Sequence, residues 1–588
     1  MALRYYGMLA VLLLFSCQLF ASSVISISPV SHDTDAARNT SIVVNFDGPV
    51  DPAFAVGEHF FVFGRWSGVM MGSYTLENNN SRIVFSPARS FFTGEQVTVN
   101  ISKTLMNSGG SSGNSGYCWN FMTDVDSGSM LLQEVDRIEV RRDGEGWIQT
   151  YGAYAGDLNG DGWSDYFVPN ERSNDVRVFL NDQQGGYGSF VTYPLTNAAR
   201  PSTNEATDFN NDGIIDVVVG NTQNNQVHVM IGDGNGGFTT TNLTAGNGVR
   251  GITILDLNGD GKMDVVTANR DGDNLSVFLG NGNGTFISSG VVEATGTDET
   301  AIVAADANND GIQDLFVGAL SSQEVILLLG DGNGGLTVSD KVSAGGTPWM
   351  ITAGDVNGDG FADAVVANSS NGTAGVIIGD GNGNLTPAVT YSTGGDFPIA
   401  IDLGDIDGDG DLDMMSSSFG TGAQGSGNWR LFENSGNGTF PIFEDYEPST
   451  SASCAVFHDR NNDGIMDVTG IDELDDLLFL FSNTLTGIGD NNDLAPDQFA
   501  LGQNYPNPFN PTTRINYVLT ASGNTSLELF DLAGRRVATL FSGWQNPGSY
   551  NADWAGVDAA GKEVASGIYL YRLQQGSLTI SKKMMLLR

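Results

Sequence analysis

The amino-acid sequence predicts an all-β protein, and three observations lead to this prediction. Glycine accounts for 78 of 588 residues and proline for only 17, a composition that favours many turns over a disordered chain. Short runs rich in β-branched residues alternate with clusters of Gly, Asn and Asp, which is the pattern of strands joined by hairpins. One nine-residue phrase recurs seven times in the central part of the chain, so we expect a repeat architecture.

The repeated phrase has the form Asp-x-Asn-x-Asp-Gly-x-x-Asp, and its copies begin 48 to 54 residues apart. Positions 1, 3, 5 and 9 carry oxygen side chains, and the glycine at position 6 permits a sharp turn between them. Together with the backbone carbonyl of position 7, these oxygens can surround a hard cation. No His or Cys is in place to favour zinc. We therefore predict about seven Ca²⁺ ions, one in each repeat.

The predicted metal ligands of the seven loops, with position 7 contributing its carbonyl oxygen, are Asp157, Asn159, Asp161, Trp163 and Asp165; Asp208, Asn210, Asp212, Ile214 and Asp216; Asp256, Asn258, Asp260, Lys262 and Asp264; Asp306, Asn308, Asp310, Ile312 and Asp314; Asp355, Asn357, Asp359, Phe361 and Asp363; Asp405, Asp407, Asp409, Asp411 and Asp413; and Asp459, Asn461, Asp463, Ile465 and Asp467.

The repeated phrase has two other interpretations. An EF-hand requires a Glu at position 12 and flanking helices, but position 12 is never Glu here and the following residues, such as 217–219, read as buried strands. Alternatively, the loops are Asp/Asn/Gly turns that hold no cation. Turn chemistry alone does not require Asp at position 9, so we favour metal binding.

Each repeat contains further strands. In the second repeat, strands are expected at 217–220 and 227–231, and a Gly/Asn hairpin follows at 232–238. Four short strands in each repeat describe the blade of a β-propeller. We therefore predict a seven-bladed propeller over residues 130–486.

The seventh repeat lacks its Gly/Asn hairpin after residues 477–481, so its outer strand is missing. Residues 130–141 are strand-like and precede the first full repeat. We expect this segment to supply the fourth strand of the last blade and to close the ring, which would leave only short, protected edges.

The Asp loops and their Gly/Asn/Phe hairpins resemble FG-GAP or VCBS repeats, the calcium-binding blades of integrin α-subunit propellers and of many bacterial surface proteins. The resemblance covers about residues 130–486. It implies calcium in every blade loop, and it implies no single ligand, because the family is functionally mixed.

The N-terminal part begins with a segment, residues 1–22, that reads as a secretory signal peptide, with a positive start and a short apolar run. A lipoprotein with an acylated Cys17 is the alternative. Residues 23–126 show alternating strands and turns and resemble bacterial Ig-like β-sandwich domains, which implies a spacer or adhesion module without chemistry.

The C-terminal part consists of a polar linker, residues 487–500, and a segment, 501–588, with strands, Gly/Pro turns and a basic end. The segment 501–588 resembles the C-terminal sorting domain of the type IX secretion system, through Tyr505-Pro-Asn-Pro-Phe-Asn-Pro and the Lys582-Lys583 tail. This resemblance implies the type IX machinery as a partner and a secreted or outer-surface location. Another Ig-like module is the alternative.

Charge and composition limit the partners. The formal net charge is −43, which would repel nucleic-acid phosphates. No segment after the leader is apolar and long enough to cross a membrane. Cys118 and Cys454 are expected to be free thiols, because two distant cysteines are no disulfide framework.

No catalytic constellation is recognisable in the sequence. Only four His are present, and His228 alternates with apolar residues in a strand, so a structural role is expected for it. No unique base with a neighbouring basic cluster can be identified. We therefore predict a protein that is not an enzyme and that binds or displays glycan or protein ligands. A propeller-type polysaccharide lyase, or another carbohydrate-active enzyme, and a structural spacer of the cell surface are the alternatives.

Overall fold

A computed structural model describes residues 23–588 except 109–114, 421–426, 449, 484–499, 502–503, 505–512, 532–534, 559–561, 563, 577 and 587–588. The predicted signal peptide, nearly all of the linker and the Tyr505 motif lie outside the described residues. The chain divides into two compact units, Met1–Asn483 and Thr484–Arg588, and the described residues of both are all-β apart from a few short helical turns.

The first unit begins with a β-sandwich of two four-stranded sheets, which we call the N-terminal sandwich. One sheet has the order β1 (Val24–Ser28), β2 (Ile42–Phe46), β6 (Arg82–Pro87), β5 (Gly72–Glu77); the other has the order β4 (Gly68–Val69), β3 (Phe60–Gly64), β7 (Gln96–Ile101), β8 (Tyr117–Met122). Alternate residues of β2 and β6 are buried, and Phe60, Phe85 and Trp119 lie in the shared core. A 3₁₀ turn spans Pro52–Phe54 and helix α1 spans Lys103–Met106.

Seven four-stranded antiparallel sheets follow, here called the repeat sheets 1 to 7. Their strands, in order from the first to the fourth of each sheet, are β10 (Tyr154–Gly156), β11 (Asp165–Asn170), β12 (Asp175–Asn181), β13 (Tyr187–Pro194); β14 (Pro201–Thr207), β15 (Asp216–Asn221), β16 (Gln226–Gly232), β17 (Phe238–Thr244); β18 (Val249–Leu255), β19 (Asp264–Asn269), β20 (Asn274–Gly280), β21 (Phe286–Val292); β22 (Glu299–Ala305), β23 (Asp314–Ala319), β24 (Glu324–Gly330), β25 (Leu336–Ser343); β26 (Pro348–Gly354), β27 (Asp363–Asn368), β28 (Thr373–Ile377), β29 (Val389–Ser392); β30 (Pro398–Gly404), β31 (Asp413–Ser418), β32 (Asn428–Glu433), β33 (Ile442–Tyr446); and β34 (Ala452–His458), β35 (Asp467–Asp472), β36 (Leu477–Asn483), β9 (Leu132–Glu139). A further 3₁₀ turn spans Arg270–Gly272.

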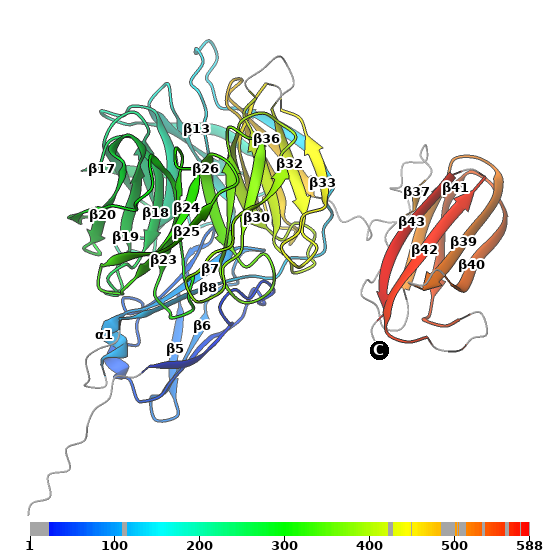
Figure 1. Ribbon diagram of the computed structural model, residues 1–588, viewed down its shortest axis with the longest axis horizontal. Coiled ribbons are helices and arrows are strands. Elements are labelled where there is room, and N and C mark those ends of the chain that lie inside the picture. Colours follow the sequence, from blue (N-terminus) through cyan, green and yellow to red (C-terminus); the bar gives the residue numbers. More distant parts are fainter. Residues whose placement is uncertain are drawn as a thin grey trace, which may run out of the picture. The chain divides into compact units, whose positions relative to one another are not determined.

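Burial within each repeat sheet follows the order of its strands. Every residue of the second strands, such as β15, is buried, whereas fourth strands such as β17 are largely exposed. The first strands of consecutive sheets contact one another from β14 to β34, and β10 contacts both β14 and β34. Apolar clusters fill the spaces between neighbouring sheets, so these sheets pack face to face (Figure 1).

Strand β9 completes the last repeat sheet. It pairs with β36 in antiparallel register, from Leu477 opposite Glu139 to Asn483 opposite Leu132. The expectation that the segment before the first full repeat supplies the missing strand is confirmed by this pairing.

The second unit is a separate β-sandwich. One sheet has the order β37 (Ala500–Leu501), β38 (Thr513–Leu519), β41 (Gly548–Trp554), and the other has the order β40 (Arg536–Gln545), β39 (Gly523–Asp531), β42 (Gly567–Gln575), β43 (Leu578–Leu586). Its core includes Trp554 and Tyr571.

Two expectations about single residues can be compared with the fold. Cys118 and Cys454 are free thiols, as predicted, and Cys118 is buried whereas Cys454 is half-buried. His228 is buried, and its ring nitrogens lie 3.0 Å from Asn221 Nδ2 and 3.1 Å from the Thr196 carbonyl, which fits the structural role predicted for it.

Among the described residues, none of the helices has the length and apolar character of a membrane span.

Candidate metal loops and central cavity

Each Asp loop joins the first strand of a repeat sheet to the second. In loop two, the Asp208 carboxylate accepts the N–H groups of Asp212 at 3.2 Å and Gly213 at 2.8 Å. Asn210 Oδ1 also accepts the Asp212 N–H, at 2.9 Å, and Asp212 Oδ1 accepts that of Ile214, at 2.9 Å. The short polar side chains therefore fold the backbone around themselves, and their oxygens gather inside the loop.

The aspartate at position 9 also anchors the sheet. Asp216 Oδ2 accepts the Phe209 N–H at 2.9 Å, and its Oδ1 accepts the Gly232 N–H, across the sheet, at 2.8 Å. The bond to the N–H across the sheet recurs in all seven loops, and the bond to the N–H within the loop recurs in six. The presence of Asp at position 9 therefore does not by itself favour metal binding over a turn without a cation. This carboxylate has a structural role that needs no cation, although each oxygen keeps a second lone pair for one.

Burial makes the position-9 carboxylates costly to ionise. Burial raises the pKa of Asp216 to about 7 and that of Asp264 to about 8, and the other aspartates of each loop add to the shift. A divalent cation offsets both the desolvation of these groups and their mutual repulsion. The donor set of the loops, which is carboxylate, amide and carbonyl oxygen, is the one that calcium prefers, so the residues present fit this ion.

Loop six brings its carboxylates closest together. Asp405, Asp407 and Asp413 each place one oxygen within 4.8 Å of the others. Asp407 occupies position 3, where the other six loops have Asn. Its Oδ1 is buried and has no hydrogen-bond partner among the described residues, and burial raises its pKa to about 8. A buried carboxylate oxygen without a hydrogen-bond partner fits a ligand of a cation. Loop six is therefore the most complete of the candidate sites.

The N-terminal sandwich packs on the Asp loops, which the sequence did not indicate (Figure 1). Arg89 Nη1 lies 3.2 Å from Asp157 Oδ2 in loop one. Asn100 Nδ2 donates to Asp256 Oδ2 in loop three at 2.8 Å. Side chains of the sandwich therefore contact residues that are also predicted metal ligands.

Backbone contacts extend this interface to further loops. The Cys118 N–H donates to the Gly311 carbonyl in loop four at 2.7 Å, and the Asp126 N–H donates to that of Gly464 in loop seven at 2.8 Å. Thr34 Oγ1 donates to a carbonyl in loop six at 2.5 Å. The sandwich thus covers the loop end of the repeat sheets.

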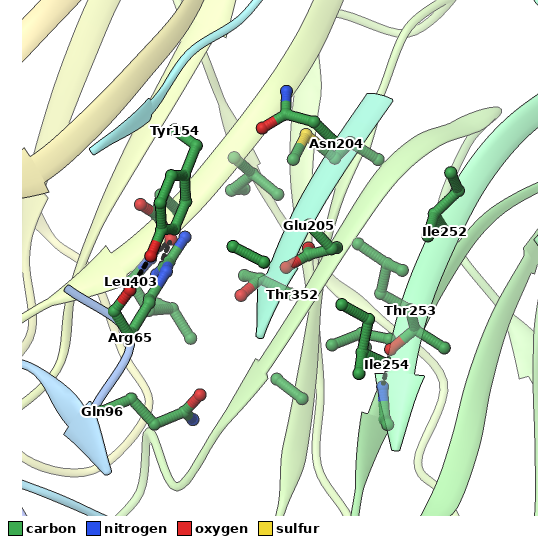
Figure 2. Close-up of a pocket in the computed structure, with 18 of the residues that line it drawn as sticks. Arg65, Gln96, Tyr154, Asn204, Glu205, Ile252, Thr253, Ile254, Thr352 and Leu403 are labelled. Atoms are coloured by element: carbon green, nitrogen blue, oxygen red, sulfur yellow. Dashed lines mark hydrogen bonds and ion pairs between the residues drawn. The ribbon is translucent and has the colours of Figure 1, made fainter. Parts of the chain in front are cut away.

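A cavity of about 310 Å³ lies between the sandwich and the first strands of the repeat sheets. Figure 2 shows Arg65 from the sandwich beside Tyr154, and Glu205 of β14 pointing into the same space. Arg65 forms an ion pair with Asp402 of β30 at 3.3 Å, and the Tyr154 hydroxyl donates to the Arg65 carbonyl. The surface of Glu205 is exposed to the cavity, and desolvation by the surrounding fold raises its pKa to about 7. Residues of the sandwich, such as Phe61 and Gln96, border the cavity at the loop end.

A second hollow of about 200 Å³ opens at the opposite end, and we call it the mouth hollow. The Asp loops follow the ends of the first strands, so residues at the starts of these strands lie at the opposite end of each sheet. Tyr151, Arg250 and Trp349 occupy such positions and line both the mouth hollow and the cavity. Glu171 and Glu473 line the hollow from the loops that follow second strands.

Acidic and basic side chains meet around the mouth hollow, although no such cluster is recognisable in the sequence. Glu171, Glu473, Arg200 and Arg250 come from four different repeats and meet around one hollow. No local motif marks them. The signal available was their shared place in the repeat, because each lies one residue away from the terminal residue of a strand.

Comparison with known proteins gives partial matches. The family described as FG-GAP-like repeat matches residues 157–219, 208–267, 256–317, 306–366 and 355–416. A bacterial Ig-like domain matches residues 21–123, and a FlgD Ig-like domain matches residues 510–577. The chain carries FG-GAP-like repeats and a bacterial Ig-like domain. The FG-GAP-like repeats coincide with Asp loops one to six, and the type IX interpretation of the C-terminal unit stays a prediction.

No curated protein matches this chain. Among solved structures, an Agrocybe aegerita lectin described as recognising non-reducing terminal N-acetylglucosamine is 15% identical, with 75% of this chain and 97% of that chain covered and a TM-score of 0.35. A Desulfotomaculum acetoxidans protein described as functionally unknown is 16% identical, with coverages of 65% and 96% and a TM-score of 0.36. A Lactobacillus plantarum protein is 14% identical, with coverages of 67% and 98% and a TM-score of 0.40.

Proposed function

We propose that this chain is a secreted or surface-attached calcium-binding protein whose seven repeat sheets are the blades of a closed β-propeller, and that it binds or displays glycan or protein ligands without catalysis. The observation that carries the proposal is the recurrence of one oxygen-rich loop at the same place in seven sheets of the same strand order. A repeated loop favours a repeated structural ion over a catalytic pair, because a catalytic pair needs to occur only once.

Two contacts support closure of the ring. Strand β9 precedes the first repeat sheet in the chain yet pairs into the last one. The first strand of sheet 1, β10, contacts its counterparts in both sheet 2 and sheet 7. A closed ring buries the sheet edges that would otherwise invite pairing with other chains.

Calcium would act here as a structural ion. The side chains at positions 1, 3, 5 and 9 and the carbonyl of position 7 would hold it, as in loop six with Asp405, Asp407, Asp409, Asp411 and Asp413. When bound, the ion supplies positive charge among crowded carboxylates. The backbone bonds of position 9 then hold the loaded loop to the second and third strands.

The ligand-binding surface would lie at the mouth end of the propeller. The sandwich occupies the loop end, through contacts with loops one, three, four, six and seven. Loops at the opposite end are free of this cover and surround the mouth hollow. Surface loops on a rigid scaffold are the usual carriers of binding function.

Export would use the leader and the C-terminal unit. We infer that residues 1–22 direct passage of the inner membrane and that 501–588 address the type IX machinery. The compact C-terminal sandwich is compatible with this role and equally with an Ig-like module, as its FlgD-like match indicates. Expression of the chain with and without residues 501–588 in a bacterium with this system tests the inference: retention of the truncated chain in the periplasm supports it, and unchanged release contradicts it.

The experiment that tests the main proposal is a metal count combined with thermal unfolding of the chain lacking its leader. About seven calcium ions and a large fall in Tm in excess chelator would support the structural role. Absence of bound calcium together with an unchanged Tm would overturn it.

An enzyme is the second candidate, because the mouth hollow combines carboxyl groups with arginines. A polysaccharide lyase acting on acidic glycans would release unsaturated sugars, which absorb in the ultraviolet. Incubation with a panel of acidic polysaccharides distinguishes the candidates: product formation establishes an enzyme, and its absence over the panel favours binding.

A further inference from the structure

The mouth hollow is built from groups that donate hydrogen bonds. Three arginines, Arg200, Arg250 and Arg270, line it together with aromatic rings and side-chain amides. In a chain with a formal net charge of −43, three guanidinium groups around one hollow form a local positive cluster. Two glutamates, Glu171 and Glu473, share the hollow with these arginines, and their partners decide how much of the positive charge remains.

Glu171 is already paired. Its Oε1 accepts the Ser202 hydroxyl at 2.5 Å, and its Oε2 accepts Gln149 Nε2 at 2.9 Å and lies 3.6 Å from Arg200 Nη1. This carboxylate therefore offsets one arginine and has its acceptors in use. Arg270 is paired as well, since its Nε lies 2.9 Å from Asp271 Oδ1. Among the described residues, Arg250 is the lining arginine that remains for a ligand.

Glu473 has an unpaired oxygen. The residue is 3% exposed, its Oε1 accepts Gln149 Nε2 at 2.8 Å, and its Oε2 is buried without a partner among the described residues. A buried polar atom without a partner is costly and needs an explanation. A ligand atom in the hollow that Glu473 lines would supply the missing partner.

The protonation of Glu473 indicates what kind of atom this is. The charged groups that face it are Glu171, Arg200 and Arg250, and burial, the largest influence, raises its pKa to about 8. At neutral pH the group is therefore mostly neutral and carries a proton that it can donate. Glu473 thus adds to the donors of the hollow.

Arg250 is held in place by an aromatic neighbour. Its guanidinium lies 4.0 Å from the centroid of the Trp349 ring, and its Nε is buried without a partner among the described residues. Trp349 is itself fixed, because its Nε1 donates to the Tyr151 hydroxyl at 3.0 Å and its ring packs edge-on against Phe397 at 5.2 Å. A fixed guanidinium loses little entropy when it binds a planar anion.

We propose that the mouth hollow binds one carboxylate-bearing sugar unit, a hexuronate. This inference rests on the proposed binding function and names its ligand class. The carboxylate matches the guanidinium fork of Arg250, the aromatic lining suits the C–H face of a pyranose ring, and Thr222 and Gln223 offer partners for hydroxyl groups. A volume of about 200 Å³ is suited to a single sugar unit rather than to a long chain.

Isothermal titration of the calcium-saturated chain with sodium glucuronate, glucose and inorganic phosphate tests the proposal. The expected result is saturable binding of glucuronate, at least tenfold weaker binding of glucose, and no displacement of glucuronate by equimolar phosphate. Equal affinity for glucose and glucuronate would show that the carboxylate is not recognised. Displacement by phosphate would show a general anion site. Either result overturns the proposal.

The variant Arg250→Gln should weaken glucuronate binding at least tenfold and leave the calcium count unchanged. Arg137→Gln is the matched control, because Arg137 also lies over an aromatic ring, Phe479 at 4.2 Å, but on the outer strand β9 and outside the hollow. If Arg250→Gln does not fold, Arg270→Gln, whose side chain is 31% exposed, replaces it. Unchanged binding in the folded variant refutes the proposal.

The calcium count and Tm measured on the same protein separate this inference from the proposed function. If calcium is bound but glucuronate is not, only the proposal of a hexuronate ligand is overturned. Absence of calcium removes the scaffold proposal, whatever the titration with glucuronate shows.

Discussion

Loop five allows the anchoring role of position 9 to be separated from metal binding. Asp363 is fully buried, and its two oxygens accept the N–H groups of Val356 at 3.1 Å and Gly379 at 2.9 Å. Asp359, at position 5 of the same loop, is exposed, and its carboxylate accepts the Phe361 N–H and the Asn357 side-chain amide, both at 3.0 Å. Both are predicted calcium ligands, so the variants Asp363→Ala and Asp359→Ala should both lower stability in calcium.

In excess chelator the two variants should differ. Asp363→Ala leaves two buried N–H groups without an acceptor, at a cost of about 1–3 kcal/mol each. Burial raises the pKa of Asp363 to about 7, so its removal also relieves a desolvation cost, and we expect a net loss of about 2–3 kcal/mol. Asp359→Ala should cost less than about 0.5 kcal/mol in chelator, because water replaces an exposed acceptor.

In calcium, each variant should also lose the contribution of one ion. At a free concentration tenfold above the Kd of the site, this contribution is about 1.4 kcal/mol. Urea unfolding of the two variants and the parent, each in calcium and in chelator, measures all of these differences. If the two variants are equally stable in chelator, the anchoring role is refuted. If Asp359→Ala has no effect in calcium, loop five does not use position 5 as a ligand.

Three further predictions follow from other parts of the fold. Asn100→Ala should lower the Tm by a few degrees, since it removes the 2.8 Å bond from the sandwich to Asp256; an unchanged Tm with unchanged protease resistance of the sandwich would contradict the role of this contact. Deletion of residues 132–139 should expose β36 and cause concentration-dependent association, measurable by light scattering, and a monomer of parental stability would count against it. The raised pKa of Glu473 should give the parent extra stability below about pH 4, and this stability should be lost as the pH rises through about 8. Glu473→Gln should flatten this part of the pH profile, and parallel profiles of parent and variant would exclude the effect.

The repeating parts of the structure could be predicted because their signals are local and recur. Seven copies of one phrase give the positions of first and second strands, and the missing hairpin after residues 477–481 indicated that another segment had to pair there, which is the case for β9. The use of Asp at position 9 was predicted only in part. Its bond to an N–H at the third strand, 16 residues further along the chain, leaves no trace in the loop sequence.

The docking of the sandwich and the mouth hollow could not be predicted from the sequence. Asn100 and its partner Asp256 are 156 residues apart, and no sequence pattern includes both residues. The hollow gathers single residues such as Glu171, Arg250 and Glu473 from different repeats. Their side chains meet only because the repeat sheets pack on one another, and this packing depends on the whole set of contacts between neighbouring sheets.

The pairing of β9 with β36 has a consequence for the order of folding. The paired residues Glu139 and Leu477 are separated by more than three hundred residues, so a chain that emerges with its N-terminus first exposes β9 long before its partner exists. Contacts between such distant segments form slowly, and sheets 1 to 6 can assemble while the last sheet is incomplete. An open ring with two unpaired strand edges is therefore the expected intermediate, and it is the state most prone to pairing with another chain during synthesis or export.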